Sequence, residues 1–276
     1  MRKLNFIVRI LIGILLALSC SSDNEQINHR NSGLLKTAKN YIGEIIDTEL
    51  ELKYNNDSQI SSLTLIQGNF LELTYTVEYE GKKVRTITFN SNLKSQPSNP
   101  TITEIYQVDY IANEIILTLA NSETKKVFTV TDGFVDSYKS FYGPNNIYQN
   151  ESVFKRDADN NIESITYYTT YTPAPEELIW KYTFSNFDND AILNSAYNPV
   201  FNYSHSLYDY VTGLILNLEI SKGIPLNSSM LDGNENYKED HVTANIEVDE
   251  HGKVFSLSYE YSDLPSNDYL LEFQYY

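Results

Sequence analysis

Apolar and polar residues alternate with a period of two along most of the chain after about residue 46. In residues 71–79, the odd-numbered positions are Leu, Leu, Tyr, Val and Tyr, and the even-numbered positions are Glu, Thr, Thr and Glu. Successive side chains of a strand point to opposite faces, so this pattern predicts a strand with one buried and one solvated face. Fourteen segments fit the same pattern: 49–54, 60–66, 70–80, 84–89, 102–110, 115–119, 127–131, 134–141, 152–156, 162–171, 178–184, 242–248, 254–261 and 269–275.

Short polar turns separate many of these segments, for example at 80–83, 132–133 and 249–252. Strands joined this tightly must be antiparallel, because a parallel return needs a long crossover. A flat sheet of this many strands would leave edges that aggregate, so we expect it to curve strongly. Both strand faces carry Lys, Glu and Thr, unlike the apolar outer band of a membrane-spanning barrel. The sequence thus predicts a mainly β fold, an antiparallel meander that forms a strongly curved sheet or a barrel-like soluble domain.

One interval has helical spacing instead of alternation. Its apolar residues recur mostly at intervals of three or four: Leu207, Val211, Leu214, Ile215 and Leu218. This spacing predicts a short helix near 206–214 that plugs or covers one side of the curved sheet. The overlapping segment 214–220 also alternates as a strand would, and that alternative stays open at this point.

The N-terminus has the features of an export signal. Arg2 and Lys3 precede an apolar stretch whose uninterrupted part, 10–18, is too short to span a bilayer as a helix. Small residues just before Cys20 resemble the lipobox of bacterial lipoproteins, which implies that Cys20 becomes the first mature residue and carries lipid. The alternative is a buried thiol at the end of a signal-anchor helix. We therefore expect a lipoprotein signal peptide over 1–19, a flexible tether over 20–32 and a single β-rich domain over 33–276.

Charge and cysteine content narrow the possible partners. The chain has 37 acidic and 20 basic residues and a net charge of −17, so it offers no cationic surface for nucleic acid. Its single cysteine excludes a disulfide framework. The expected membrane contact is through the N-terminal lipid.

Three windows along the chain share one pattern, 55–63, 157–165 and 249–257, and a looser copy lies at 187–192. Each full copy has a polar acidic turn, a branched apolar residue, any residue, Ser and a second apolar residue. Asx side chains bond their own backbone two residues on, and Gly or Asn accepts positive φ, so each window can reverse a strand. Repeated turn chemistry of a β-meander explains much of this similarity. The remainder resembles the tyrosine- and aspartate-rich hairpin units of Bacteroidota-type cell-envelope lipoproteins of unknown function, some with a porin-like curved sheet. The polar stretch 21–25 resembles their surface-export tether, without its adjacent acids. The resemblance implies an outer-membrane, lipid-anchored location at the cell surface, with the periplasmic face as the alternative.

Sequence patterns for chemistry are sparse. The four histidines lack metal-binding spacing and no GxSxG elbow occurs, so we predict no catalytic residue, metal site or cofactor. Two acidic loops match the first three ligand positions of a calcium-binding loop but lack its Gly and final Glu: Asp157, Asp159, Asn161 and Asp232, Asn234, Asn236. Asx turns are the favoured explanation, with a different kind of calcium site as the alternative. The adjacent acids Glu176 and Glu177 are expected to lie on a solvated loop.

Aromatic residues give the remaining candidate site. Trp180 and Tyr182 share one face of a predicted strand, as do Tyr167 and Tyr171. Rings on a rigid sheet can stack on a sugar, or they can fill the core as a cross-strand ladder. The leading hypothesis is a non-enzymatic, lipid-anchored envelope protein that binds a glycan or an envelope protein. A surface polysaccharide hydrolase with paired carboxylates and a structural spacer are the alternatives.

Overall fold

Sixteen strands and one helix make up the described part of the chain. The computed structural model describes residues 33–94, 100–143, 148–171, 177–190, 207–234, 236–261 and 269–276. In chain order the elements are β1 (Leu35–Ile42), β2 (Ile45–Tyr54), β3 (Ile60–Gln67), β4 (Leu71–Glu80), β5 (Lys83–Leu93), β6 (Ile102–Ile111), β7 (Glu114–Leu119), β8 (Lys125–Thr131), β9 (Phe134–Tyr142), β10 (Tyr148–Arg156), β11 (Ile162–Tyr171), β12 (Glu177–Asp188), α3 (Leu207–Ile215), β13 (Ile224–Asp232), β14 (Tyr237–Val248), β15 (Val254–Tyr261) and β16 (Tyr269–Tyr275).

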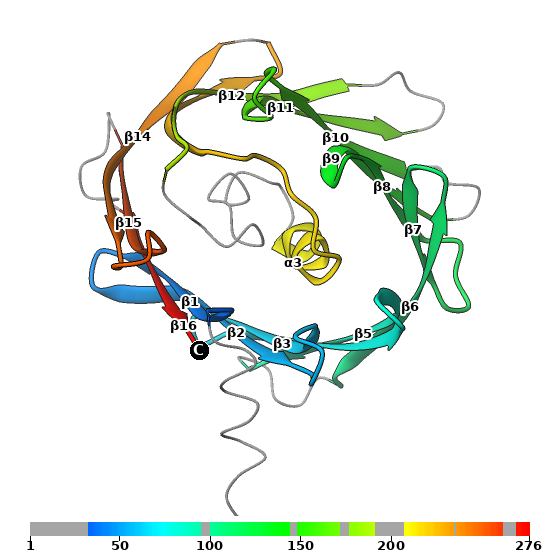
Figure 1. Cartoon of the computed structure of the whole chain (residues 1–276). Coiled ribbons are helices and arrows are strands. Elements are labelled where there is room, and N and C mark those ends of the chain that lie inside the picture. The colour runs from blue at the N-terminus through cyan, green and yellow to red at the C-terminus, as the bar shows by residue number, and fades with distance from the viewer. Residues whose placement is uncertain are drawn as a thin grey trace, which may run out of the picture.

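The strands form one closed antiparallel barrel, which Figure 1 shows along its axis. Each strand pairs with its neighbours in sequence, and β1 closes the ring by pairing with β16 from Leu35 opposite Tyr275 to Ile42 opposite Tyr269. Closure gives both terminal strands a partner on each side, which removes the free edges of an open sheet. The predicted antiparallel meander is confirmed.

The sequence pattern missed two of these strands, β1 and β13. In β1, apolar residues do not fall at every second position and the burial pattern is irregular, so no strict alternation marks the strand. In β13, Pro225 follows the first residue, and most later positions are half-buried. A proline is tolerated near the start of a strand, although it weakens a sequence-based assignment.

The barrel has two ends that differ in their connections. The hairpins 55–59, 81–82, 112–113, 132–133, 157–161 and 249–253 lie at one end, here named the turn end. Residues 33 and 276 lie there too, because the Gly33 N–H donates to the Tyr276 carbonyl at 3.0 Å and the Tyr276 N–H donates to the Leu34 carbonyl at 3.0 Å. The opposite end is named the loop end.

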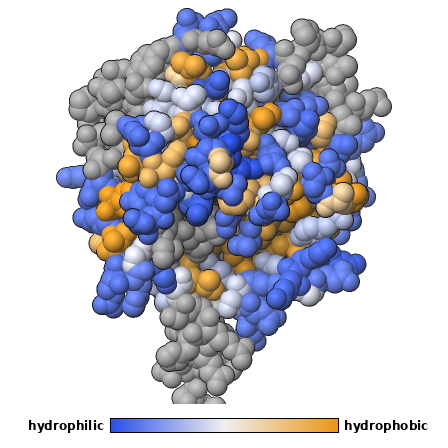
Figure 2. Space-filling model, turned by 45° about the horizontal axis from the view of Figure 1, so that its top comes forward, coloured by the Kyte–Doolittle hydropathy of each residue, from blue (hydrophilic) through white to orange (hydrophobic). Residues whose placement is uncertain are grey.

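The apolar faces of the strands point into the barrel. In β4, Leu73 and Tyr75 are 0% and 3% exposed, whereas the alternate residues lie on the outer face. Ion pairs between neighbouring strands lie on that outer face, such as Lys39 with Glu49 at 3.3 Å. Hydrophilic residues with scattered apolar ones cover the face shown in Figure 2. This is the reverse of a membrane-spanning barrel, whose apolar band faces outward.

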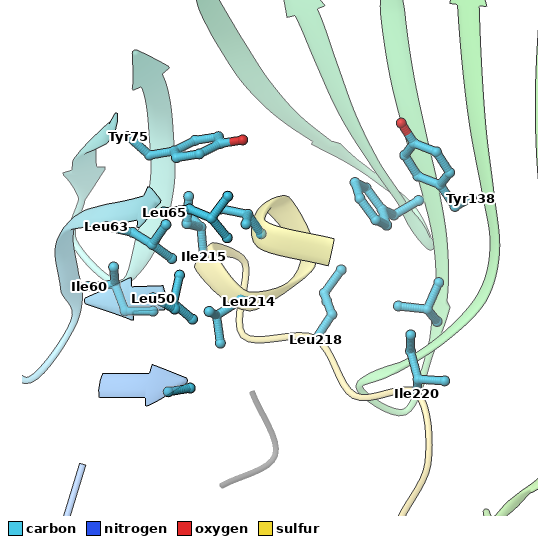
Figure 3. Close-up of a cluster of buried hydrophobic side chains, with 14 of the residues drawn as sticks. Leu50, Ile60, Leu63, Leu65, Tyr75, Tyr138, Leu214, Ile215, Leu218 and Ile220 are labelled. Atoms are coloured by element: carbon cyan, nitrogen blue, oxygen red, sulfur yellow. The ribbon is translucent and has the colours of Figure 1, made fainter. Parts of the chain in front are cut away.

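Helix α3 lies inside the barrel (Figure 1). Leu214 and Ile215 are 0% and 3% exposed, and Figure 3 shows them beside Leu50, Leu63 and Leu65 of the wall. The helix corresponds to the one predicted near 206–214, although residue 206 itself lies outside the described residues. The strand alternative for 214–220 is wrong, because the chain turns after the helix and Glu219 alone forms a β-bridge there.

Residues 218–223, here named the strap, fasten the helix to the turn end. The Val135 N–H donates to the Glu219 carbonyl at 2.8 Å, and the Glu219 N–H donates to the Gly133 carbonyl at 3.1 Å. The strap therefore continues the hydrogen bonding of the β8–β9 hairpin into the interior.

The end of the strap is held by the β10–β11 hairpin. The Ser221 hydroxyl accepts the Ile162 N–H at 3.1 Å and donates to the Gly223 carbonyl at 2.8 Å. The Gly223 N–H donates to Asn161 Oδ1 at 2.9 Å, and a Cβ on Gly223 would lie only 2.8 Å from that oxygen. A side chain at position 223 would therefore require the Asn161 side chain, which is buried and hydrogen-bonded to the Gly223 N–H, to move.

Candidate functional site

The three sequence windows form the same kind of turn. Asp157 Oδ1 accepts the backbone N–H groups of Asp159 at 2.8 Å and Asn161 at 2.9 Å, and the Asp157 N–H donates to the Asn161 carbonyl at 2.9 Å. Asn55 and Asp249 accept the N–H groups two and four residues on in the same way. The repeat is therefore a structural unit that reverses the chain at the turn end.

The fourth residue of each window has the backbone conformation that this turn requires. The φ angles of Ser58, Asn160 and Gly252 are 61°, 66° and 79°, all in the left-handed region. Asn and Gly adopt it readily, which explains the residue types of two windows. Ser58 adopts it as well, although serine has no particular preference for this conformation.

The acidic loops considered for calcium are Asx turns. Asp232 Oδ1 accepts the N–H groups of Asn234 and Asn236, both at 2.9 Å, as Asp157 does in its own loop. The Lys253 N–H and then the His251 N–H lower the pKa of the Asp249 carboxyl in the third window. Among the described residues, no group of three or more His, Cys, Asp or Glu side chains is placed to hold a metal ion.

Tyrosines at the ends of even-numbered strands clamp the neighbouring odd-numbered strand. The hydroxyls of Tyr54 and Tyr275 donate to the carbonyls of Leu35 and Val254, both at 2.7 Å, and each acceptor is the first residue of its strand. Tyr79 makes the same bond to the first residue of β3 at 2.9 Å. These bonds give a structural role to part of the tyrosine content that the sequence associated with an envelope family.

Burial of the clamp tyrosines changes their acid–base behaviour. Burial raises the pKa of Tyr79 and of Tyr275 to about 12, and it raises that of Tyr54 well above its ordinary value. The charged phenolate is disfavoured in an apolar setting, so the neutral hydroxyl stays available as a donor.

An arginine takes the place of tyrosine on β10. The Arg156 guanidinium donates to the Val135 carbonyl and pairs with the Asp136 carboxylate, both near the start of β9. A planar group with several donors can hold a carbonyl and a carboxylate together. We name such a side chain, a Tyr or Arg near the end of an even-numbered strand that bonds a carbonyl near the start of the neighbouring odd-numbered strand, a clamp. The sequence pattern does not reveal the clamps.

The turn-end half of the interior is packed with aliphatic side chains. Every odd-numbered strand contributes one buried residue from its first two positions: Leu35, Ile60, Val84, Ile115, Val135, Ile162, Ile224 and Val254. Together with Leu214 and Ile215 of α3, they belong to one hydrophobic core. Contacts among these buried side chains connect all the odd-numbered strands, and they stabilise this half of the barrel.

The aromatic residues proposed as a sugar platform form a buried ladder. Trp180 is 2% exposed, and its ring stacks on that of Tyr167 with centroids 5.1 Å apart and planes 11° apart. Tyr182 meets Trp180 edge-on, with centroids 4.9 Å apart. Tyr167 and Trp180 are directly paired residues of β11 and β12, so cross-strand contact is the reason they stack. The structure places Trp180 in the core, not on an exposed platform, and the side chain of Tyr171 lies outside the described part.

A small cavity lies on the inner wall beside α3. It measures about 20 Å³ and is lined by Tyr75, Ile87, Phe89, Glu104, Tyr106, Leu117, Lys126 and Thr212. This volume holds about one water molecule. Glu104 is the one carboxylate in the lining and accepts the Tyr106 hydroxyl at 2.8 Å. A glycosidase needs two facing carboxyl groups, so this cavity does not provide the pair that the hydrolase alternative requires.

Some predicted features fall outside the described residues. They are the signal peptide 1–19, the lipidation residue Cys20, the tether 20–32 and Glu176. Glu177 begins β12 and is exposed. In the part of the chain that the structure describes, no helix has the length and hydropathy needed to cross a membrane.

Comparison with known proteins gives matches at the level of structure. No protein-family model and no curated protein matches the chain. One solved structure that it matches is a porin-like protein from Bacteroides vulgatus, with 14% sequence identity and a TM-score of 0.48 over 88% of this chain and 98% of that one. Another is a porin-like protein from Bacteroides uniformis, with 11% identity and a TM-score of 0.41 over 89% of this chain and 99% of that one.

Proposed function

We propose that the protein is a lipid-anchored component of the bacterial cell envelope that binds a glycan or another envelope protein and performs no bond chemistry. The observation that carries the proposal is the position of Gly33, which is hydrogen-bonded to Tyr276 at the turn end. A lipid on Cys20, connected through 20–32, would therefore hold the packed turn end toward the membrane. The loop end would then point away from it.

The connections at the two ends support this orientation. Of the six hairpins at the turn end, three have two residues and three are the Asx turns described above, and the long connection between β12 and β13 leads into the barrel interior through α3 and the strap. At the loop end, β5 and β6 are joined by 94–101, and β15 and β16 by 262–268. Binding residues occur disproportionately on loops carried by a rigid scaffold, so the loop end is the better candidate for contact with a partner.

The polarity of the wall supports attachment through lipid. Charged residues lie on the outer face, for example Lys139 and Glu151, paired at 3.1 Å, and Lys155 and Glu163, paired at 2.8 Å. Charged side chains facing lipid are destabilising in a membrane barrel. The barrel would accordingly sit beside the membrane, held there by the acyl chains.

Substitution of the cysteine tests this proposal. Cys20→Ser should move the protein from the membrane fraction to the soluble fraction and abolish labelling by a fatty-acid analogue, because the thiol that accepts the lipid is gone. Ser21→Ala, at the next position, is the matched control and should leave the protein in the membrane fraction. Continued membrane association of Cys20→Ser would overturn lipid anchoring.

A further inference from the structure

Exposed apolar residues gather along one sector of the loop end, on strands β2 to β6 and the connections between them. Ile45 is 74% exposed, Ile102 56% and Phe70 47%, and Ile46 and Leu93 are both 39% exposed. We name these five residues the apolar rim. A single exposed apolar residue is common on any protein, whereas a continuous group of them marks a site of contact with a partner.

Backbone hydrogen bonds join the first members of the apolar rim. The Gly68 N–H donates to the Asp47 carbonyl at 2.8 Å, across the neighbouring strands β2 and β3. Asp47 directly follows the two isoleucines of the rim, and Phe70 lies two residues after Gly68. The hairpin tip with the isoleucines and the hairpin with Phe70 are therefore side by side.

The other members continue the rim onto β5 and β6. The Lys94 N–H donates to the Phe70 carbonyl at 2.8 Å, which brings Leu93 next to the phenylalanine. Ile102 is paired with Ser91, two residues before Leu93 on the same strand. The rim is thus continuous across strands that are neighbours in the barrel wall (Figure 1).

Two loop-end connections outside this sector have a different composition. Residues 120–124 between β7 and β8 are Ala, Asn, Ser, Glu and Thr, and residues 233, 234 and 236 between β13 and β14 are Gly, Asn and Asn. These residues are small or polar, as is usual for surface turns. The apolar rim therefore belongs to one side of the loop end and does not follow from loop position alone.

The charged residues that the structure describes around the rim are mainly acidic. Lys94 pairs with Glu72 at 2.8 Å, so these two charges offset each other. Glu44, Asp47 and Glu104 each lie within two residues of a member of the rim. The whole chain also carries a net charge of −17. A partner that fits this surface therefore combines apolar side chains with positive charge.

We propose that the apolar rim binds a short basic, amphipathic segment of another envelope protein, with apolar residues at alternate positions and Lys or Arg at its ends. The inference rests on the proposed function, because it selects a protein as the partner and places it on the loop end. Five strands about 4.8 Å apart span roughly 19 Å, which equals about six residues of extended chain. Alternate side chains of such a segment point to one face, so about three of them meet the rim.

The acidic surroundings disfavour two other apolar partners. A second copy of this chain would bring the same negative charges against one another. Anionic lipid headgroups would be repelled in the same way, and the lipid anchor precedes Gly33, which lies at the opposite end of the barrel. A basic segment of another protein meets neither obstacle.

The test uses the full chain held in lipid nanodiscs and the heptapeptide Lys-Leu-Thr-Leu-Thr-Leu-Lys, blocked at both termini. Isothermal titration calorimetry measures the binding. Replacing both Lys by Glu should weaken it at least about fivefold, and replacing the three Leu by Ser at least about tenfold, because charge attraction and apolar contact are removed in turn. The difference between the Lys and Glu peptides should shrink in about 0.5 M salt, because salt screens exposed charges.

Variants of the protein locate the site. Ile45→Ser/Ile102→Ser removes the two most exposed members of the rim and should weaken binding of the Lys peptide about tenfold. Ile111→Ser/Val248→Ser is the matched control, because Ile111 and Val248 are 58% and 45% exposed but lie at the turn end. The control should bind as the wild type does. Both variants should melt within about 2 °C of the wild type, since exposed side chains contribute little to stability.

Several results would overturn the inference. Equal binding by Ile45→Ser/Ile102→Ser would exclude the rim as the site, and a fall of several degrees in its melting temperature would assign the rim to structure. Absence of peptide binding, or equal binding of the Lys and Glu peptides, would exclude the partner chemistry. Rim-dependent binding to vesicles of phosphatidylethanolamine and phosphatidylglycerol would assign the rim to a membrane, and rim-dependent cross-linking of two copies would assign it to self-association. Membrane release of Cys20→Ser tests the lipid anchor independently of these outcomes.

Discussion

The turn end and the loop end of the barrel are built on different principles. At the turn end, each odd-numbered strand has a buried aliphatic residue at its first or second position, and clamp side chains such as Tyr275 and Arg156 hold strand starts by their carbonyls. Toward the loop end, side chains are less buried, as at Leu93 and Tyr142, which are 39% and 37% exposed. The three repeated windows thus lie at the end where the interior is packed with aliphatic side chains.

The largest effect is expected for a substitution in the helix inside the barrel. Leu214→Ala should lower the free energy of unfolding by about 2–5 kcal/mol, because the fully buried side chain leaves a cavity in the packed half. Leu93→Ala is the matched change at the loop end, where Leu93 is 39% exposed, and it should cost far less. Urea denaturation followed by circular dichroism measures both.

Equal losses for the two variants would contradict the comparison. Equally small losses would mean that Leu214 adds no more to stability than an exposed residue of the loop end does. Equally large losses would mean that the packed region extends through the whole barrel. A change in the slope of the denaturation curve for Leu214→Ala would show that the helix unfolds separately from the wall.

The strands could be predicted where burial alternates strictly, and not elsewhere. The regular β4 was found with its faces assigned correctly, because Leu73, Tyr75 and Val77 repeat at every second position. By contrast, β13 has Pro225 at its second position and half-buried residues at every later one, so its burial does not alternate. Local alternation weakens wherever the interior is not purely apolar.

The candidate site could be predicted even less, because it depends on register. Tyr167 and Trp180 were recognised as aromatic positions on separate strands, but their stacking follows from a pairing that a single strand does not encode. The clamps likewise join residues of neighbouring strands, as Tyr275 of β16 and Val254 of β15 do. None of these residues forms a motif by itself, so only the closed sheet brings them together.

The two ends can also be compared by the same change, Asp to Ala, in an Asx turn at each end. Asp157→Ala should destabilise the protein by about 1–2 kcal/mol, because two backbone N–H groups lose their acceptor. The turn also holds the strap, through the Lys222 N–H donating to the Asn160 carbonyl at 3.0 Å. Asp232→Ala removes the same pair of bonds at the loop end, without a strap, and should cost less.

Thermal denaturation of both variants measures the difference, with Asp157→Asn as the control that keeps the acceptor oxygen, as Asn55 does naturally. If Asp232→Ala proves as costly as Asp157→Ala, the link between turn and strap contributes nothing, and the two ends are equally rigid.

The clamps should make the turn end sensitive to alkali. Burial raises the pKa of Tyr79 and Tyr275 to about 12, above the value of 10.0 for an exposed tyrosine. A raised folded-state pKa means that the neutral form contributes stability below pH 10, and that this contribution is lost as the pH rises toward 12. Unfolding midpoints measured from pH 9 to 12 should therefore fall steeply.

A clamp variant separates this effect from general alkaline unfolding. Tyr275→Phe should cost about 1 kcal/mol at neutral pH, because the bond to the Val254 carbonyl is lost. Its stability should then fall less between pH 10 and 12, since one titrating group is gone. Tyr41→Phe, whose hydroxyl bonds Glu272 at 2.8 Å on the exposed surface, should be nearly neutral. A pH dependence that Tyr275→Phe leaves unaltered would refute the clamp as its origin.

The smallest expected effect is that of calcium on the acidic turns at both ends. In each turn one carboxylate oxygen already accepts two backbone N–H groups, as Asp157 and Asp232 show, which leaves too few free oxygens for an ion that takes six to eight. A ligand stabilises the folded state only when it binds that state in preference to the unfolded one. Millimolar calcium should therefore leave the melting temperature unchanged, as should the same concentration of magnesium. A rise of several degrees with calcium that disappears in Asp157→Asn would show that the turn-end loop coordinates the ion, and would give the repeated turns a role beyond closing the barrel.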